Sequence, residues 1–217
     1  MSVVYLVRHG QASFGTDDYD RLSELGKDQS RITGEHLAAQ QVAPVRLIHG
    51  EMLRQRQTAE GIQAGLGSAL DPQIDTGWNE YQAWELTDAL DDTDPRAQQD
   101  SKIFQAELER GAARWASGEH DEDYSESFDQ FTTRVDRALD DACANLKSGE
   151  TTVIVSSAGA IAWTAARLLG GGFDQWMAFN RVTVNTGITR IITGRSGTSL
   201  TSFNEHGHQS PERVTYR

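Results

Sequence analysis

The stretch that decides the fold is SVVYLVRHG, residues 2–10, in which an unbroken apolar run of strand length ends in Arg-His-Gly at 8–10. Continuous rather than alternating apolarity is typical of a strand that is covered on both faces, as in parallel sheets. Residues 45–48 (VRLI) and 152–155 (TVIV) follow the same pattern. The sequence therefore predicts a buried sheet whose first strand delivers a cation and an imidazole to its carboxyl end.

Helical patterns separate these strands. Ser23 is a good N-cap for one predicted helix, and Ser127 with Gln130 forms a capping box at the start of another. The predicted helices cover residues 23–40, 52–66, 128–146 and 160–169. Strands that alternate with helices predict an α/β fold, a three-layer α/β/α sandwich with a mostly parallel sheet. Residues 185–204 add two strands around a glycine-rich turn.

One segment differs in composition from the rest of the 217-residue chain. Residues 81–123 carry the acidic runs DALDDTDPRAQQD and EHDEDY, with a helical pattern at 103–115 between them. Such acidic runs are typical of a solvated face. A chain of this length fits one α/β domain. We therefore predict a single domain over residues 1–217 with a partly helical insertion at about 81–123.

The composition excludes several classes of partner. A formal net charge of −12 argues against nucleic acid, which requires a basic face, and no run approaches the roughly 18 apolar residues of a membrane span. Cys143 is the only cysteine, so no internal disulfide forms, and its apolar helical setting predicts a packed residue rather than a nucleophile. We expect a cytoplasmic protein without nucleic-acid or membrane partners; the oligomeric state is not predicted.

Four short motifs follow the predicted strands or open the predicted helices. After Arg-His-Gly at 8–10 come LSELGKDQ at 22–29, LRQRQTA at 53–59 and WNEY at 78–81. Together they resemble the signature elements of the histidine phosphatase superfamily, also called the phosphoglycerate mutase-like family. The resemblance runs over most of the chain. Arg-His-Gly alone is a weak signal, but its combination with the Arg-x-x-Gln-Thr-Ala helix is a specific one.

The resemblance implies a phosphatase that hydrolyses phosphate monoesters through a phosphohistidine intermediate. His9 would be the nucleophile, and Glu80 would protonate the leaving oxygen and then activate water. Arg8 and Arg54 would clamp the phosphate with planar, multi-donor groups. Arg56 lies about 200° around the helix from Arg54, so both cannot face the site.

The same resemblance bears on the reaction class and on partners. It implies no cofactor and no metal, and a small phosphorylated substrate. Mutase activity is less expected, because mutases of the family tend to be longer and to keep a second histidine. A net charge of −12 opposes the approach of an anion, so the arginines must act locally.

The sequence departs from the family after the third strand. The family has Ser-His-Gly-Gly there, and alignment of strand and helix places Ser157 where the second histidine belongs, with Ala158 in place of a glycine. Both are candidate substrate-binding residues, because a hydroxyl and the N–H groups at a helix start favour an anion. A neutral donor is worth roughly half a charge-assisted one, so we expect weaker phosphate binding or slower turnover. An imidazole restored at position 157 is expected to raise the rate unless the pocket has closed around serine.

Further departures concern a phosphate donor and three histidines. Where the family has a small polar residue and then Trp-Asn, this chain has Ala12, Phe14 and Gly15. His49 follows the second strand, and it either restores imidazole chemistry or, the interpretation that we favour, caps the strand or faces solvent. His206 and His208 would share one face of a strand, but without a third ligand no metal site is predicted.

A second function stays open at this point. The chain could be a catalytically weak or inactive module on the same fold that binds a phosphorylated ligand through Arg8 and Arg54. Ser157 motivates this alternative. The presence of both His9 and Glu80 counts against it, because binding alone needs neither a nucleophile nor an acid.

Overall fold

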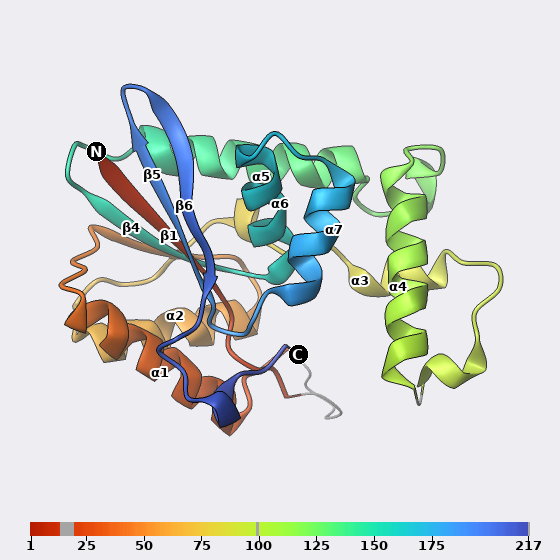
Figure 1. Cartoon of the computed structure of the whole chain (residues 1–217), viewed down its shortest axis with the longest axis horizontal. Helices are drawn as coiled ribbons and strands as arrows, with labels where there is room; N and C mark the ends of the chain where they lie inside the picture. Colours follow the sequence, from red (N-terminus) through yellow and green to blue (C-terminus); the bar gives the residue numbers. More distant parts are fainter. Residues whose placement is uncertain (14–19, 99, 217) are drawn as a thin grey trace. The chain divides into compact units, whose positions relative to one another are not determined.

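The first apolar stretch forms a strand inside the sheet. The structure is a computed structural model that describes residues 1–13, 20–98 and 100–216 (Figure 1). Strand β1 (Ser2–Arg8) pairs in parallel with β4 (Thr151–Ser156) and antiparallel with β5 (Ile188–Gly194). Leu6 and Val7, on opposite faces of β1, are both fully buried. Both faces are therefore covered, as the unbroken apolar pattern predicts.

In the described part of the chain, one sheet holds six strands in the order β3-β2-β4-β1-β5-β6. Its other strands are β2 (Arg46–His49), β3 (Gln73–Ile74) and β6 (Gly197–Glu205). Strands β3, β2, β4 and β1 run parallel, whereas β5 and β6 form an antiparallel hairpin at the other edge. This mostly parallel sheet confirms the predicted α/β class. The carboxyl ends of β1, β2 and β4 meet at one edge, where sheets of this type bind ligands.

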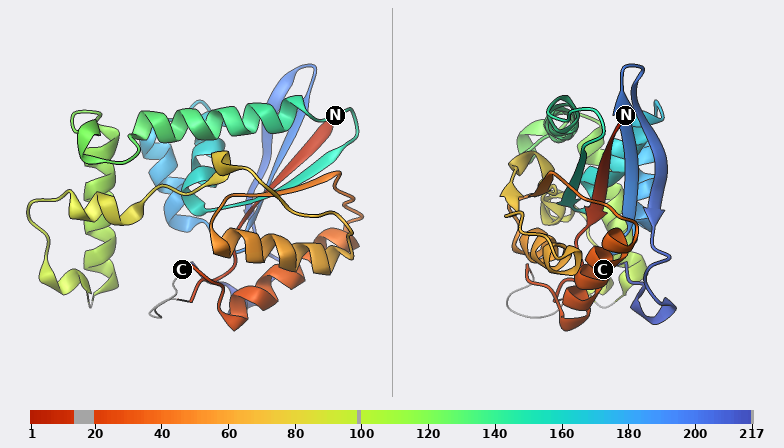
Figure 2. Two further views of the ribbon diagram at one scale, coloured as in Figure 1. Left: turned by 180° about the vertical axis from the view of Figure 1, so that it is seen from behind. Right: turned by 90° about the vertical axis from the view of Figure 1, so that its left-hand side faces the viewer.

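Helices cover both faces of the sheet (Figures 1 and 2). Helices α1 (Glu24–Ala39) and α2 (Leu53–Leu66) pack together on one face, and α6 (Ala158–Leu168) lies on the other. Side chains from α1, α2 and four strands form a buried cluster: Val7, Leu37, Leu47, Ala59, Ile62, Val153, Val155 and Ile188. Helix α1 starts as predicted, because the Ser23 hydroxyl accepts a hydrogen bond from Gly26 N at 3.0 Å.

The sequence pattern does not predict helix α7 (Phe173–Val182), which follows the glycine run at 170–172. Its signal is the spacing of Phe173, Trp176 and Met177 at i, i+3 and i+4. Trp176 is fully buried, and its indole N–H donates to Gly159 O at 2.9 Å. A tryptophan with a buried hydrogen-bond partner thus fixes α7 on the start of α6.

Two compact units make up the chain: Met1–Glu80 with Val135–Arg217, and Tyr81–Arg134. The second unit holds α3 (Ala83–Asp88), α4 (Ser101–Ala116), the start of α5 (Phe128–Ala144), and the short 3-10 helices η2 (Pro95–Gln98) and η3 (Asp121–Asp123). Its core is aromatic, with Trp115 at 5.2 Å from Tyr81 and 5.4 Å from Phe131 between ring centroids. The single domain with an insertion at about 81–123 stays a prediction.

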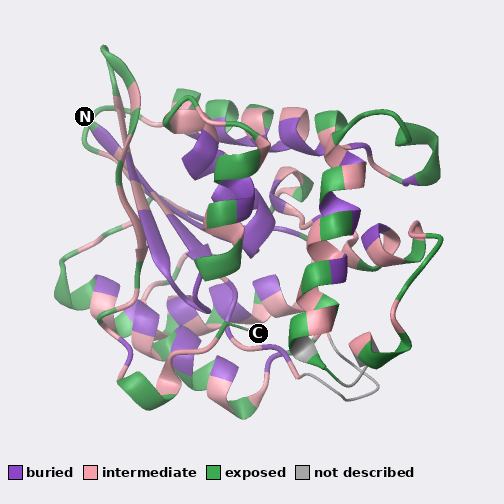
Figure 3. Cartoon of the chain, turned by 45° about the vertical axis from the view of Figure 1, so that its right-hand side comes forward, coloured by how far each residue is buried: buried purple, intermediate pink, exposed green. Residues whose placement is uncertain are grey.

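Local features of both units agree with the sequence patterns. The capping box of α5 is present, because Ser127 N donates to Gln130 Oε1 at 2.8 Å and Gln130 N donates to Ser127 Oγ at 3.2 Å. Buried residues concentrate in the strands and on the inner faces of helices (Figure 3). The first unit also contains η1 (Thr76–Trp78) and η4 (Pro211–Arg213). Within the described residues, no helix combines the length and apolarity that a membrane crossing requires.

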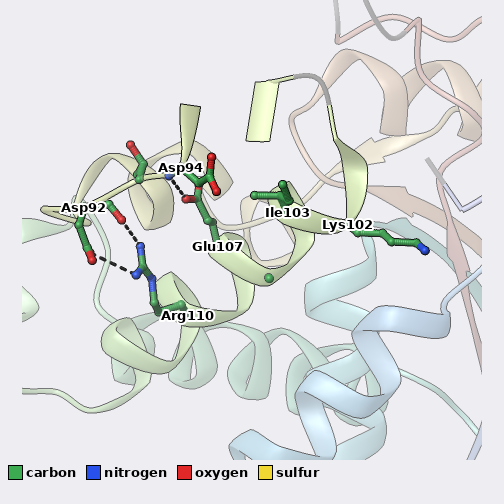
Figure 4. Close-up of a pocket in the computed structure, with 8 residues that line it drawn as sticks. Asp92, Asp94, Lys102, Ile103, Glu107 and Arg110 are labelled. Carbon is green, nitrogen blue, oxygen red and sulfur yellow. Dashed lines mark hydrogen bonds and ion pairs between the residues drawn. The ribbon is translucent and has the colours of Figure 1, made fainter. Parts of the chain in front are cut away.

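The acidic run of the second unit is partly engaged in local contacts. A pocket there is lined by Asp92, Thr93, Asp94, Lys102, Ile103, Ala106, Glu107 and Arg110 (Figure 4). Arg110 Nη1 lies 3.2 Å from Asp92 Oδ1, and the Asp94 N–H donates to Glu107 Oε1. Asp92 is still well exposed. The run is therefore a solvated face that α4 holds in place.

Candidate active site

The site begins at the carboxyl end of β1. His9 N donates to Ser156 O at 2.9 Å, so the residue continues the pairing of β1 with β4. The side chain is buried, with 6% of its surface exposed. Gly10 follows because a Cβ at this position would lie 2.4 Å from Gly26 O. A close approach between this turn and α1 therefore requires glycine.

Two contacts fix the imidazole ring of His9. Nδ1 lies 2.8 Å from Gly10 O, and a carbonyl oxygen only accepts, so Nδ1 carries the proton. Nε2 accepts a hydrogen bond from Arg54 Nε at 3.2 Å. The ring is thus held in the tautomer that leaves a lone pair on Nε2, the atom that faces the guanidinium.

The surroundings keep this ring neutral. Burial lowers the pKa of His9 well below its usual value, and the positive charges of Arg54 and Arg8 lower it further, in that order. The contact with Gly10 O acts in the opposite direction but does not outweigh them. A neutral imidazole beside two guanidinium groups combines a nucleophilic nitrogen with cations that bind oxyanions.

Arg54 comes from the first turn of α2 and has a second partner. Its Nη1 lies 2.6 Å from Asp20 Oδ1, and the other oxygen of Asp20 accepts from Leu53 N at 2.8 Å. The Arg54 side chain is 12% exposed, whereas that of Asp20 is 41% exposed. Asp20 therefore sits at the rim and orients Arg54. No motif pointed to it, because its partner lies 34 residues away.

Two further arginines of the motifs, Arg56 and Arg8, lie in different surroundings from Arg54. Arg56 pairs with Glu60 on the exposed side of α2, at 3.7 Å, so it does not share the direction of Arg54. Arg8, just before His9, donates from Nη1 to Thr183 O at the end of α7. The helix that the sequence did not predict thus holds one of the two candidate phosphate-binding arginines.

Glu80 is bound to the start of α6. Its Oε2 accepts a hydrogen bond from Gly159 N at 2.8 Å. Trp78, two residues earlier, is anchored, because its carbonyl accepts from Ser156 Oγ at 2.7 Å and from Gln55 Nε2 at 3.2 Å. Loop, strand and helix therefore meet at the edge that carries His9, and a carboxylate is stabilised there by the helix N-terminus.

Ser157 and Ala158 lie at the same helix start. Ser157 is the N-cap residue of α6 and is 1% exposed. Its hydroxyl accepts from Gln55 Nε2 at 2.9 Å instead of capping the helix. Ala158 is also buried. Position 157 is therefore packed against α2 through Gln55, a residue that the sequence analysis did not single out.

The sequence analysis singles out three further histidines, His49, His206 and His208, and all three lie in the described residues. His49 is 2% exposed, so it does not face solvent, and its Nδ1 lies 2.6 Å from Gly50 O, the same local contact that His9 makes. His208 stacks on His36 of α1 with ring centroids 5.0 Å apart. His206 Nδ1 contacts Asn204 O at 2.7 Å. No group of three or more histidine, cysteine or carboxylate side chains in the described residues is arranged to hold a metal.

The contacts thus join some of the predicted residues directly. His9 contacts Arg54, Glu80 contacts the helix start after Ser157, and Ser157 contacts α2. Of the departures near His9, Ala12 is buried and bridges to Leu22. Phe14 and Gly15 lie outside the described residues.

Comparison with known proteins gives a consistent picture. Residues 4–206 match the model of the histidine phosphatase superfamily (branch 1). A comparison with curated proteins found no match. Among solved structures, Bacillus stearothermophilus YhfR has a TM-score of 0.71 at 19% identity, covering 96% of this chain and 99% of that one. Mycobacterial hydrolase 2 has a TM-score of 0.67 at 24% identity, covering 97% and 93%. Phosphoserine phosphatase from Entamoeba histolytica, in complex with 3-phosphoglyceric acid, has a TM-score of 0.65 at 20% identity, covering 96% of this chain and 99% of that one. These likenesses establish the fold.

Proposed function

This chain belongs to the histidine phosphatase superfamily (branch 1), and from that membership we propose that it hydrolyses small phosphate monoesters through a phosphohistidine at His9. The observation that carries the proposal is the state of His9, a buried neutral ring whose Nε2 lone pair faces Arg54. A nucleophile must present a lone pair, and a phosphoryl group in transfer needs cations around its oxygens. His9 supplies the lone pair and Arg54 the cation, once the substrate phosphate takes over the Arg54 N–H that Nε2 accepts in the free protein.

The proposed first step transfers the phosphoryl group to the ring. A bond forms between His9 Nε2 and phosphorus as the bond between phosphorus and the ester oxygen breaks. The leaving oxygen takes a proton from the Glu80 carboxyl and departs as an alcohol. The ring becomes positively charged, and Gly10 O, which already accepts the Nδ1 proton, stabilises that charge.

The proposed second step returns the enzyme to its first state. A water molecule attacks phosphorus and gives a proton to the Glu80 carboxylate, and the bond between Nε2 and phosphorus breaks. The products are inorganic phosphate, neutral His9 and protonated Glu80. The hydrogen bond from Gly159 N to Glu80 supports this role, because it keeps the carboxyl group at the edge of the sheet where β1 ends.

The substrate-binding part of the proposal assigns the phosphate to Arg8, Arg54 and the start of α6. N–H groups at a helix start attract anions, and Ala158 lies in that first turn. Ser157 takes the place that a second histidine has in the family, and it would contribute no charge. We propose monoester hydrolysis rather than mutase chemistry for this reason.

Binding without turnover is the alternative on the same fold. A pure binding site gains nothing from a buried histidine whose ring is neutral and fixed in one tautomer, since a charged imidazole would hold phosphate more tightly. The tautomer and the low pKa of His9 therefore favour catalysis.

The test is phosphoryl labelling. Brief incubation with radiolabelled acetyl phosphate should place acid-labile, base-stable label on the wild-type protein and none on His9→Ala. His120→Ala, which changes an exposed histidine of the second unit, should label like wild type. Phosphate release from a panel of monoesters should disappear together with the label. Label that persists in His9→Ala, or release of phosphate without any label, would overturn the mechanism.

A further inference from the structure

A chain of buried and part-buried hydrogen bonds supports the His9 turn. His9 O accepts from Asn185 Nδ2 at 3.0 Å, on one side of Gly10. Gln11 N donates to Gln29 Oε1 at 2.8 Å, on the other side. The two amide side chains are both fully buried. The backbone before and after Gly10 is therefore held by side chains from two distant parts of the chain.

The hydroxyl of Thr215 links the two amide side chains and completes this chain of hydrogen bonds. Thr215, which follows η4, accepts from Gln29 Nε2 at 2.9 Å and donates to Asn185 Oδ1 at 2.9 Å. The backbone carbonyl of Thr215 also accepts a hydrogen bond from Asn185 N at 2.8 Å. A hydroxyl can accept from one amide and donate to the other through a single oxygen atom.

We propose that Thr215 is a positioning residue for His9, acting through Asn185 and Gln29. The segment after η4 thereby fixes the orientation of the His9 imidazole. This inference rests on the proposed function. Catalysis through a nucleophile requires its reacting atom to be held closely in place, and a misplacement on the order of 1 Å costs up to about 10²-fold in rate. The backbone contacts at His9 O and Gln11 N hold the main chain that carries the imidazole, while Arg54 contacts the imidazole itself at Nε2.

The alternative is that Thr215 only stabilises the packing of its own segment. That segment has independent anchors, because Gln29 Nε2 also donates to Arg213 O at 2.6 Å and Gln209 Nε2 donates to Thr186 Oγ1 at 3.1 Å. Loss of the Thr215 hydroxyl therefore leaves the segment in place but breaks the hydrogen-bonded link between Gln29 and Asn185. The two explanations predict different effects on His9.

The experiment compares three variants of the full chain. Thr215→Val removes the hydroxyl at nearly constant shape, and Thr215→Ser keeps it. Thr201→Val makes the same chemical change in the β5–β6 hairpin, where the hydroxyl donates to Arg190 O at 2.9 Å and has no contact with the ring. The readouts are kcat and KM for a phosphate monoester, and the tautomer and titration of the His9 ring followed by ¹⁵N-detected NMR.

We expect kcat to fall about tenfold in Thr215→Val with little change in KM, and the His9 ring to lose its single tautomer. Thr215→Ser and Thr201→Val should match wild type in both readouts. A Thr215→Val protein with wild-type kcat and wild-type His9 signals would overturn the proposal. If wild type itself releases no phosphate, the proposed function fails, and the NMR comparison alone decides whether Thr215 positions His9.

Discussion

At the scale of single residues, the site depends on one ring that must stay uncharged. His9 presents its Nε2 lone pair only in the neutral form, and protonation would place a third cation beside Arg8 and Arg54. Burial is the largest cause of its lowered pKa, and the two guanidinium groups add to it. The same arginines that would bind phosphate therefore keep the proposed nucleophile neutral.

This coupling predicts the pH dependence of catalysis. Because the folded pKa of His9 is lowered, the ring stays neutral below its ordinary value of 6.5, and the acidic limb of kcat/KM should lie below that pH. Arg54→Gln removes the second cause, so the acidic limb should move to higher pH, whereas Arg54→Lys should hold it near its wild-type position. Profiles corrected for the titration of the substrate check this. A limb that stays in place in Arg54→Gln would show that the Arg54 charge does not lower the pKa of His9.

Ser157 gives a second prediction at this scale. The sequence favours a rate gain in Ser157→His, but the side chain is 1% exposed and bonded to Gln55, so the space has closed around serine. We expect Ser157→His to lower the free energy of unfolding by about 1–3 kcal/mol and not to speed turnover. Ser157→His with Gln55→Ala makes room for the ring and should recover part of the loss. Urea unfolding and kcat measurements test both; a stable and faster single variant would contradict the packing argument.

At the scale of elements, the segment after β6 docks on α1 through a histidine stack. His208 Nε2 lies 3.0 Å from Thr33 Oγ1, and its ring stacks on His36. Burial, followed by the neighbouring His36 and His206, lowers the pKa of His208 to about 4. Protonation of His208 therefore favours the unfolded chain, in which the histidine has its ordinary affinity for protons.

The corresponding prediction concerns stability. Between pH 6.5 and about 4 the unfolded chain binds a proton at position 208 that the folded chain does not, so stability is lost as pH falls through this window. After allowance for the partial exposure of the ring, we expect His208 to account for about 1–2 kcal/mol of that loss. His208→Gln should flatten the decline, and His120→Gln, at an exposed position, should not. Equal slopes in all three proteins would remove His208 from this role.

The elements also show where sequence patterns carry information. Strand β1, the hairpin of β5 and β6, and the caps at Ser23 and Ser127 follow from local rules, so the sequence predicts them. Helix α7 does not follow, because its start lies beside three glycines that are typical of a helix end. The local signal for termination is strong there, whereas the reason for α7 is a tertiary one, the burial of Trp176.

The residues of the candidate site also separate into those that local sequence motifs indicate and those that only the tertiary structure brings in. His9, Arg8, Arg54 and Glu80 are found in the sequence because each belongs to a short motif. Asp20 and Thr215 belong to no motif, and Gln55 fills a variable position of the 53–59 motif; each acts through a partner that is distant in the sequence. Contacts of this kind depend on the fold and not on spacing along the chain, so one sequence alone could not reveal them.

At the scale of the whole molecule, charge opposes the proposed substrate. A net charge of −12 repels an anionic ester at long range, and the attraction of Arg8 and Arg54 acts only nearby. Added salt screens the long-range part, since the Debye length falls from about 30 Å at 0.01 M to about 8 Å at 0.15 M. We therefore predict that kcat/KM rises over this range, while kcat changes little. A fall in kcat/KM with sodium chloride would mean that the local arginine field governs the encounter.

The place of β1 in the sheet has a consequence for synthesis on the ribosome. Val3 is synthesised well before Thr151 and Ile192, its neighbours across the strands. At roughly 5–20 residues per second, this apolar segment waits on the order of ten seconds or more with both of its edges bare. Such a segment is a target for chaperones and for other nascent chains. His9, which follows this segment, is therefore made well before Ser156 and Asn185, the residues that hold its backbone in place.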